Sequence, residues 1–375
     1  MADGPARGLT AYNLAFGKFE LFQTHQFQPL HIWVWAALLR VFGDIYWTGT
    51  ALNVAAGAGT ALFMYLLGRQ LAGPVAGSVA ALAFIFSPVH HNLTIAMGMA
   101  ASLFFFWVAA GIYAAARATE GGRGAVAAGF CLAAAALTRY EGALLLVLYS
   151  AYLLFRSRPR GVAAWSLWAA PLALAGLFLG HKLLVGTIRG FAGAWVFSAL
   201  KADTADVLSN LRWYRRTYYG LERLWFDGRL VAVLGMFGAV MVWARRLRDE
   251  RRLVIWAGPA ALFVGLTAVA VFLGVGFAAE RYFATVLMLL FPFAGLAVVE
   301  VWRRAKGKPA KVAVASALVA AAAYTVYFDA KDYETGLVEP WHWSQINDAE
   351  LALKLRELWR RGELGPNEII YMEEN

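Results

Sequence analysis

The sequence predicts an all-α polytopic membrane protein, a bundle of about ten membrane helices, and three observations lead to that fold class. The first is composition, since 61% of the 375 residues are hydrophobic, 15% are charged, and the mean hydropathy is +0.56. Soluble domains carry about 25% charged and about 45–50% apolar residues. The second is that long apolar runs alternate with short polar turns. The third is that basic residues gather in alternate turns, as in proteins that cross a membrane repeatedly.

The net charge of +10 would indicate a nucleic-acid partner in a soluble protein. Here the basic residues lie between apolar runs, where positive charge holds turns on the cytoplasmic side of a membrane. We therefore expect a lipid bilayer, and no nucleic acid, as a partner. The single cysteine, Cys131, lies in an apolar run and cannot form an intrachain disulfide. No cleavable signal peptide is expected.

Residues 1–45 are mixed in polarity and are predicted to form a first loop outside the hydrocarbon layer. Four large apolar side chains recur there at helical spacing: Leu9, Tyr12, Phe16 and Phe19. This stripe predicts an amphipathic helix that lies at an interface. The apolar run 30–43 is too short to cross a bilayer, because crossing takes about 20 residues. We interpret it as re-entrant or interfacial.

A transmembrane domain is predicted at 46–328. Its spans are expected at 46–68, 73–88, 95–116, 123–137, 141–155, 162–185, 229–244, 253–276, 281–302 and 311–328. The pair at 123–155 fits either two short helices or a re-entrant hairpin, and both return the chain to the same side. Residues 329–375 are polar and are predicted to begin a C-terminal extracytoplasmic segment that continues into a larger domain. A short amphipathic helix is expected at 348–361.

Basic residues predict the orientation. The most basic turns, 245–252 and 303–311, are placed on the cytoplasmic side. Counting back through the spans puts the other basic turns on that side too: 156–160, 117–123 and Arg69. The long segment 186–228 also carries basic residues and is the counter-signal. Because residues 1–45 then lie outside, a membrane helix is expected before residue 1.

The outer face collects the polar exceptions, and all six histidines lie on it or at span ends facing it. Charges between apolar runs are costly and are usually retained for function. The turn 138–141 places Arg139 and Glu141 between two such runs. The protein is therefore expected to have one working face, and it is the extracytoplasmic face of a plasma (inner) membrane.

Several segments carry a family resemblance through their order and spacing. They are an acidic residue near the start, then AYNLAFG, HQFQPLHIWVWAALLRVFGD, YLLGRQLAG, SPVHH, LTRYEG and ERYFATVLMLLFP. This pattern resembles the polytopic GT-C glycosyltransferases of the glycosyltransferase family 39 group, which includes protein O-mannosyltransferases and aminoarabinose transferases. The resemblance covers about residues 1–155 and 280–328. It implies a GT-C-like bundle with interfacial helices in an outer loop, and a polyprenyl-phosphate sugar donor.

The resemblance also implies roles for individual residues. Asp3 matches the family's acidic position at the start of the first loop and would be the general base. Gly4 stands where the family usually has a second acidic residue beside it. Ala101 stands at about the place where relatives carry another acid after their third outer segment.

A leaving lipid phosphate needs cationic or hydrogen-bonding stabilisation. The expected phosphate ligands are Arg139, Arg281, Arg215 and Arg216. The expected supporting residues are Glu141, Tyr140, His25, Glu280 and His90. Structural alternatives stay open, because Arg139 and Glu141 suit an ion pair between two helices, and the other arginines suit interfacial anchors. The adjacent pair His90 and His91 has no acidic partner nearby, so no metal site is expected.

The sequence thus predicts a membrane glycosyltransferase without a cofactor. It would transfer a sugar from a polyprenyl-phosphate donor to a glycan, lipid or protein acceptor. One alternative is a non-catalytic relative that binds lipid-linked sugar, which the alanine at position 101 favours. Another is a transporter or flippase of such lipids, which would require mid-membrane charges and inverted repeats.

Overall fold

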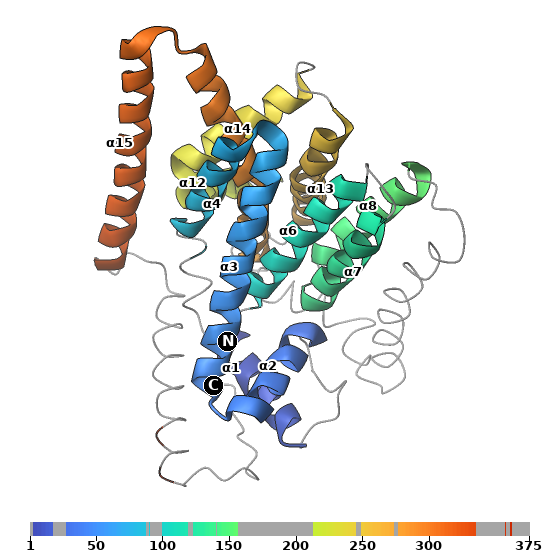
Figure 1. Cartoon of the computed structure of the whole chain (residues 1–375). Coiled ribbons are helices and arrows are strands. Elements are labelled where there is room, and N and C mark those ends of the chain that lie inside the picture. The colour runs from blue at the N-terminus through green and yellow to red at the C-terminus, as the bar shows by residue number, and fades with distance from the viewer. Residues whose placement is uncertain are drawn as a thin grey trace.

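The computed structural model describes residues 3–17, 28–87, 90, 100–118, 123–139, 141–156, 213–244, 249–273, 277–334, 357 and 361. Within these ranges the chain forms α-helices and no strand. The helices gather into one bundle, with α15 beside it (Figure 1). The all-α class predicted from the sequence is confirmed.

The helices follow one another in chain order with short connections between many of them. They are α1 (Asp3–Ala15), α2 (Pro29–Phe42), α3 (Ile45–Ala72), α4 (Pro74–Ile85), α6 (Ala101–Ala118), α7 (Arg123–Thr138), α8 (Glu141–Arg156), α12 (Trp213–Trp243), α13 (Glu250–Leu273), α14 (Phe277–Arg304) and α15 (Gly307–Glu334). Three described stretches are long and apolar enough to cross a membrane: Trp47–Ala72, Ala101–Ala118 and Phe283–Arg304. Several shorter apolar helices accompany them.

Most predicted spans coincide with helices. The pair at 123–155 is two helices, α7 and α8, of 16 residues each. The span expected at 162–185 lies outside the described residues, as do the start of the one expected at 95–116 and most of the segment after 334. The long connection predicted at 186–228 differs, because the chain is already helical from Trp213 onward. That helix breaks at Arg229, whose φ is 42°, at the start of the predicted span.

Proline and glycine set the helix ends at two turns. Pro29 and Pro74 occupy the first turns of α2 and α4, where a missing N–H leaves no intrahelical bond unmade. Gly43 ends α2 in the left-handed conformation, with a φ of 73°. Its N–H donates to the Leu39 carbonyl, which closes the last turn of α2.

Helix α14 is the centre of the bundle. Its residues from Phe283 to Val299 are buried almost without interruption, against α12, α4, α3 and α13. Glycines permit these close crossings, since a Cβ on Gly238 of α12 would meet the Phe293 carbonyl oxygen. A Cβ on Gly295 would likewise meet the Ala76 carbonyl oxygen of α4. Small residues are the usual means by which membrane helices approach each other closely.

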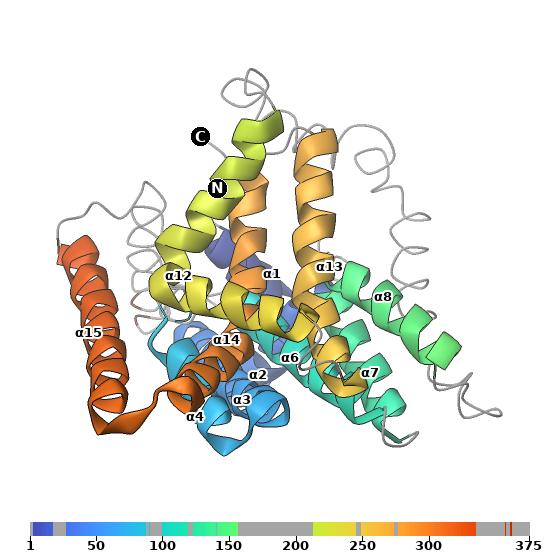
Figure 2. The same cartoon turned by 90° about the horizontal axis from the view of Figure 1, so that it is seen from above.

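The two ends of the bundle differ in chemistry. Figure 1 shows the turns α3–α4 and α14–α15 and the start of α13 at one end, and α1 with α2 at the other. Figure 2 shows the same elements from above, with α15 at the edge of the bundle. The first end carries Arg69, Arg252, Arg304 and Lys306. These four residues come from turns predicted to share one side of the membrane, and the described helix ends that carry them lie together.

Helix α1 differs from the predicted amphipathic interfacial helix. Its described residues from Arg7 to Ala15 are buried or half-buried, and the small residues Gly8 and Ala11 are among the buried ones. Of the predicted stripe, Leu9 and Phe16 are half-buried, Tyr12 is buried, and Phe19 lies outside the described residues. The reason is tertiary, because α1 packs along α2 and touches α3, and Gly8 lets the Trp35 ring come close.

We expect Gly238→Ala to destabilise the bundle by about 1–3 kcal/mol, because the added methyl group enters the contact with the Phe293 carbonyl. Thermal unfolding in detergent would measure the change. Val240→Ala is the matched control, since that side chain on the same helix is 60% exposed. Equal melting temperatures for the two variants would contradict the close crossing of α12 and α14.

Candidate functional site

The end of the bundle that holds α1 and α2 is assembled around Trp35 of α2. The indole is fully buried, and a Cβ on Gly8 of α1 would lie 2.8 Å from its Cη2. A Cβ on Gly49 of α3 would lie 2.6 Å from its Cζ2. Its Nε1 donates to Thr48 Oγ1 at 3.1 Å. Three helices thus meet on one side chain, which fixes α1 against the bundle.

A second contact secures the far end of α1. The Arg40 guanidinium, through Nε, donates to the Ala15 carbonyl at 2.6 Å. This caps the C-terminus of α1 with a cation, which the helix dipole favours. The C-terminal end of α1 is therefore held against α2.

Several polar side chains on these helices are buried. His31 of α2 and Asn13 of α1 are almost completely buried, and Arg7 is only 9% exposed. Among the described residues, no hydrogen-bond partner is found for either ring nitrogen of His31 or for Asn13 Oδ1. Buried polar groups are normally bonded, so unmatched ones indicate a place for a ligand or water. This group is the candidate site.

The electrostatics of His31 are set by its surroundings. Burial, and secondarily the neighbouring Arg7 guanidinium, lowers the pKa of His31 from 6.5 to about 3. The imidazole is therefore neutral near pH 7 and offers one hydrogen-bond donor and one acceptor. Its ring also packs edge-on against Trp35, with centroids 5.7 Å apart. A neutral imidazole beside a guanidinium can bind polar or anionic groups without adding a second charge.

Asp3, the predicted base, is the first residue of α1. Positions four residues apart share a helix face, so Asp3 lies on the same face of the backbone as Arg7. Its side chain lies outside the described residues, and its catalytic role stays a prediction.

The turn between α7 and α8 holds the other predicted charges. Arg139 donates from Nε to Glu141 Oε1 at 2.9 Å, and its Nη2 lies 2.8 Å from the same oxygen. The two side chains are 15% and 4% exposed. A Cβ on Gly142 would meet the backbone of Ala135, so the helices approach closely at this turn.

These contacts explain why a charged turn is tolerated between apolar helices. Glu141 lies in the first turn of α8, where the helix dipole favours a carboxylate. The Arg139 guanidinium also lies 5.8 Å from the centre of the Phe104 ring of α6. The ion pair that the sequence left open is thus present, and donation by Arg139 to a phosphate stays a prediction.

His90 takes a packed position. Its backbone N–H donates to the Ser87 carbonyl at 3.0 Å, and its ring centroid lies 4.5 Å from that of Phe84. The imidazole fits against Gly57 of α3, where any Cβ would meet it. Among the described residues, no three His, Cys, Asp or Glu side chains come together as metal ligands would.

The remaining predicted residues are placed only in part. Arg215 and Arg216 lie in the first turn of α12, and Glu280 and Arg281 lie early in α14. Nothing is described of these four side chains. His25 and Tyr140 lie outside the described residues.

Sequence reasoning missed Arg7, Asn13 and His31. One signal was available, because Asp3, Arg7 and Thr10 recur at helical spacing in α1. The burial of His31 was not visible, because it depends on Trp35 contacting two other helices.

Part of the sequence resembles a known protein family. Residues 26–181, which include the helices from α2 to α8, match the sequence model of the family described as dolichyl-phosphate-mannose-protein mannosyltransferase. No curated protein sequence matches the chain.

Solved structures resemble the whole arrangement. A crystal structure of ArnT from Cupriavidus metallidurans bound to undecaprenyl phosphate is similar with a TM-score of 0.59 and 15% identity, over 86% of this chain and 59% of that one. The Archaeoglobus fulgidus oligosaccharyltransferase tethered with an acceptor peptide is similar with a TM-score of 0.55 and 14% identity, over 88% of this chain and 51% of that one. AglB from Archaeoglobus fulgidus in complex with an inhibitory peptide and a dolichol-phosphate is similar with a TM-score of 0.52 and 15% identity, over 88% of this chain and 52% of that one.

The predicted GT-C resemblance is confirmed, and the chain has the membrane fold that these glycosyltransferases share. The chain spans a little over half the length of the structures it matches.

We expect the stability of the protein to fall with pH below about 6.5. Because the pKa of His31 is lowered to about 3, the unfolded chain binds more protons than the folded chain in that window. The contribution of His31 is complete above pH 6.5 and decreases by up to about 1.4 kcal/mol per pH unit as pH falls towards 3. Unfolding of the wild type and His31→Phe, measured from pH 7 to pH 4.5, should show a shallower slope for the variant. Equal slopes would mean that His31 is not held neutral.

Removing one member of the Arg139–Glu141 pair should cost more than removing both. Glu141→Leu leaves the mostly buried guanidinium without this carboxylate, and we expect a loss of about 3–5 kcal/mol. Adding Arg139→Met should restore most of that stability, because no buried charge then remains at the turn. Chemical denaturation of the single and double variants measures the difference. Additive losses would contradict a coupled pair.

Proposed function

We propose that the protein is a membrane glycosyltransferase that transfers a sugar from a polyprenyl-phosphate donor to an acceptor on the extracytoplasmic face. The observation that carries the proposal is the shared fold with ArnT, which was crystallised with undecaprenyl phosphate. The family match over 26–181 supports it independently of the structural similarity. The proposed location is the plasma (inner) membrane.

The distribution of charge supports the proposed orientation. The basic turns α3–α4 and α14–α15 and the basic start of α13 lie at the end away from α1 and α2. Positive charge favours the cytoplasmic side, so α1, α2 and the α7–α8 turn would face outward. A lipid donor could then present its phosphate to the group of buried polar residues around His31.

In the proposed reaction, the Asp3 carboxylate accepts the proton of the acceptor hydroxyl or amine. The acceptor atom forms a bond to the anomeric carbon while the bond from that carbon to the phosphate oxygen breaks. Polyprenyl phosphate departs with the bonding electrons, and cations such as Arg139 or Arg281 would stabilise its charge. No cofactor is needed for this transfer.

One observation favours a second candidate. Ala101, at about the position where relatives carry an acid, begins α6 and is buried. A protein that binds lipid-linked sugar without transferring it would fit that feature. Turnover decides between the two functions.

The test uses the full-length protein in proteoliposomes, supplied with polyprenyl-phosphate sugars. We expect Asp3→Asn to lower turnover by about 10²–10⁴-fold, the usual effect of losing a general base. Asp44→Asn is a matched control on another acid, whose Oδ1 accepts from the Trp47 N–H at 3.0 Å. Asparagine can make the same cap, so its turnover should be unchanged.

Equal turnover in Asp3→Asn and the wild type would exclude Asp3 as the base. Binding of the donor without turnover in the wild type would favour the binding protein. The stable double variant Arg139→Met with Glu141→Leu adds a further readout, since a phosphate-binding Arg139 predicts a raised KM for the donor.

A further inference from the structure

A pocket of about 460 Å³ lies at the basic end of the bundle, between the end of α14 and the start of α15. Its lining combines an aromatic ring, two cations and small apolar residues: Trp302, Gly307, Lys308, Lys311, Val312 and Ala315. Two helices contribute to it, so the turn between them shapes the pocket. The α14–α15 turn that carries these residues lies at the opposite end of the bundle from α1 and α2 (Figure 1).

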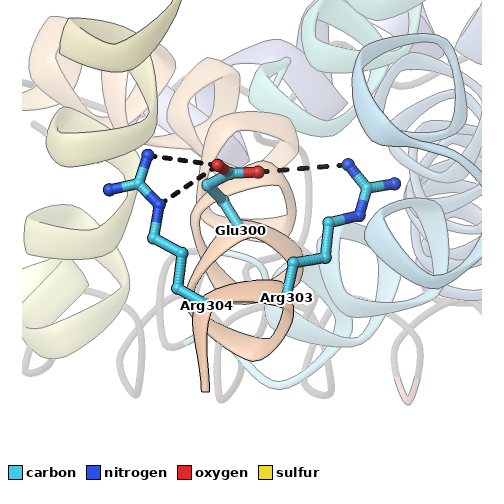
Figure 3. A network of polar contacts seen from close by, with 3 residues as sticks. All are labelled: Glu300, Arg303 and Arg304. Atoms are coloured by element: carbon cyan, nitrogen blue, oxygen red, sulfur yellow. Dashed lines mark hydrogen bonds and ion pairs between the residues drawn. The ribbon is translucent and has the colours of Figure 1, made fainter. Parts of the chain in front are cut away.

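The charges around this pocket do not cancel. Figure 3 shows that Glu300 binds both Arg303 and Arg304, at 3.9 Å and 3.1 Å. The sequence contains no acidic residue from 301 to 328. Within the described part of the chain, neither Lys308 nor Lys311 forms an ion pair. The two lysines therefore present uncompensated positive charge to whatever enters.

Lys311 is nevertheless held in position. Its Nζ lies 5.7 Å from the centre of the Trp302 ring, within the range of a cation–π contact. The pocket also includes the N-terminal end of α15, where the helix dipole is positive. Cations and dipole together favour an anion.

The surroundings distinguish a lipid from a soluble anion. Helix α15 makes few contacts with α14 and stands beside the bundle (Figure 2). Its side chains Val312 and Val319 are 57% and 69% exposed. An apolar surface that continues from a cationic pocket along a helix with a predicted span at 311–328 matches an acyl chain joined to an anionic headgroup.

We propose that this pocket binds the headgroup of an anionic phospholipid. The phosphate would contact Lys308 and Lys311, Trp302 would form the wall of the pocket, and an acyl chain would follow Val312 and Val319 along α15. The lipid then fastens a helix that has few contacts with α14 in the described part of the chain. This site is separate from the proposed transfer of sugar and does not depend on it.

The test is native mass spectrometry of the full-length protein in detergent, titrated with phosphatidylglycerol. Lys308→Gln with Lys311→Gln should weaken binding about thirtyfold, because each lysine near a membrane surface contributes about 1 kcal/mol. Lys306→Gln with Arg69→Gln removes two cations from the same end but outside the pocket, and should change binding less than twofold. Ala315→Trp should abolish binding by filling the pocket while every charge remains.

Three results would overturn the proposal. They are equal losses in the pocket and control variants, equal binding of phosphatidylcholine, and displacement of the lipid by millimolar inorganic phosphate, which would indicate a site for a free anion. The melting temperature of each variant without lipid shows that it is folded. A rise in melting temperature with phosphatidylglycerol, present in the wild type and absent in Ala315→Trp, would support the role of the lipid in fastening α15.

Discussion

The cost of placing a charge in hydrocarbon organises this chain more than any single contact. Helix α14 can lie buried at the centre because the stretch from Phe283 to Val299 carries no charge, and glycines on α12 and α14 let its neighbours touch the backbone. In the three stretches long enough to cross a membrane, Trp47–Ala72, Ala101–Ala118 and Phe283–Arg304, charges occur only near the ends, where water and headgroups are available. The difference between the two ends of the bundle follows from this constraint.

Arginine illustrates how the two ends differ. Arg303 and Arg304 are exposed and share one carboxylate at a solvated turn, where such pairs contribute little to stability. Arg7 and Arg139 are largely buried, so each requires compensation from its surroundings. The same residue type thus marks a membrane boundary at one end and a preorganised polar group at the other.

Much of the fold could be predicted from the sequence, because apolar runs and basic turns report membrane crossings directly. The helices α3, α7, α8 and α14 lie close to their predicted spans. The burial of α1 could not be predicted, since it depends on Trp35 meeting Gly8 and Gly49 from different helices. The turn at 138–141 stood out in the sequence because it carries charges between apolar runs. The sequence could not decide whether Arg139 pairs with Glu141 or binds a phosphate, because that depends on how α7 and α8 pack.

The lowered pKa of His31 shows which charges the candidate site favours. Burial first and Arg7 second lower the pKa of His31. Burial disfavours any charge here, whereas the Arg7 guanidinium favours an anion over a second cation. A neutral imidazole can donate a hydrogen bond to a phosphate or sugar hydroxyl without altering that balance. The Arg139–Glu141 pair has the opposite character, because its carboxylate already offsets the guanidinium. A phosphate meeting Arg139 would be held less tightly than by an unpaired arginine, and weaker binding suits a lipid phosphate that must leave after every transfer.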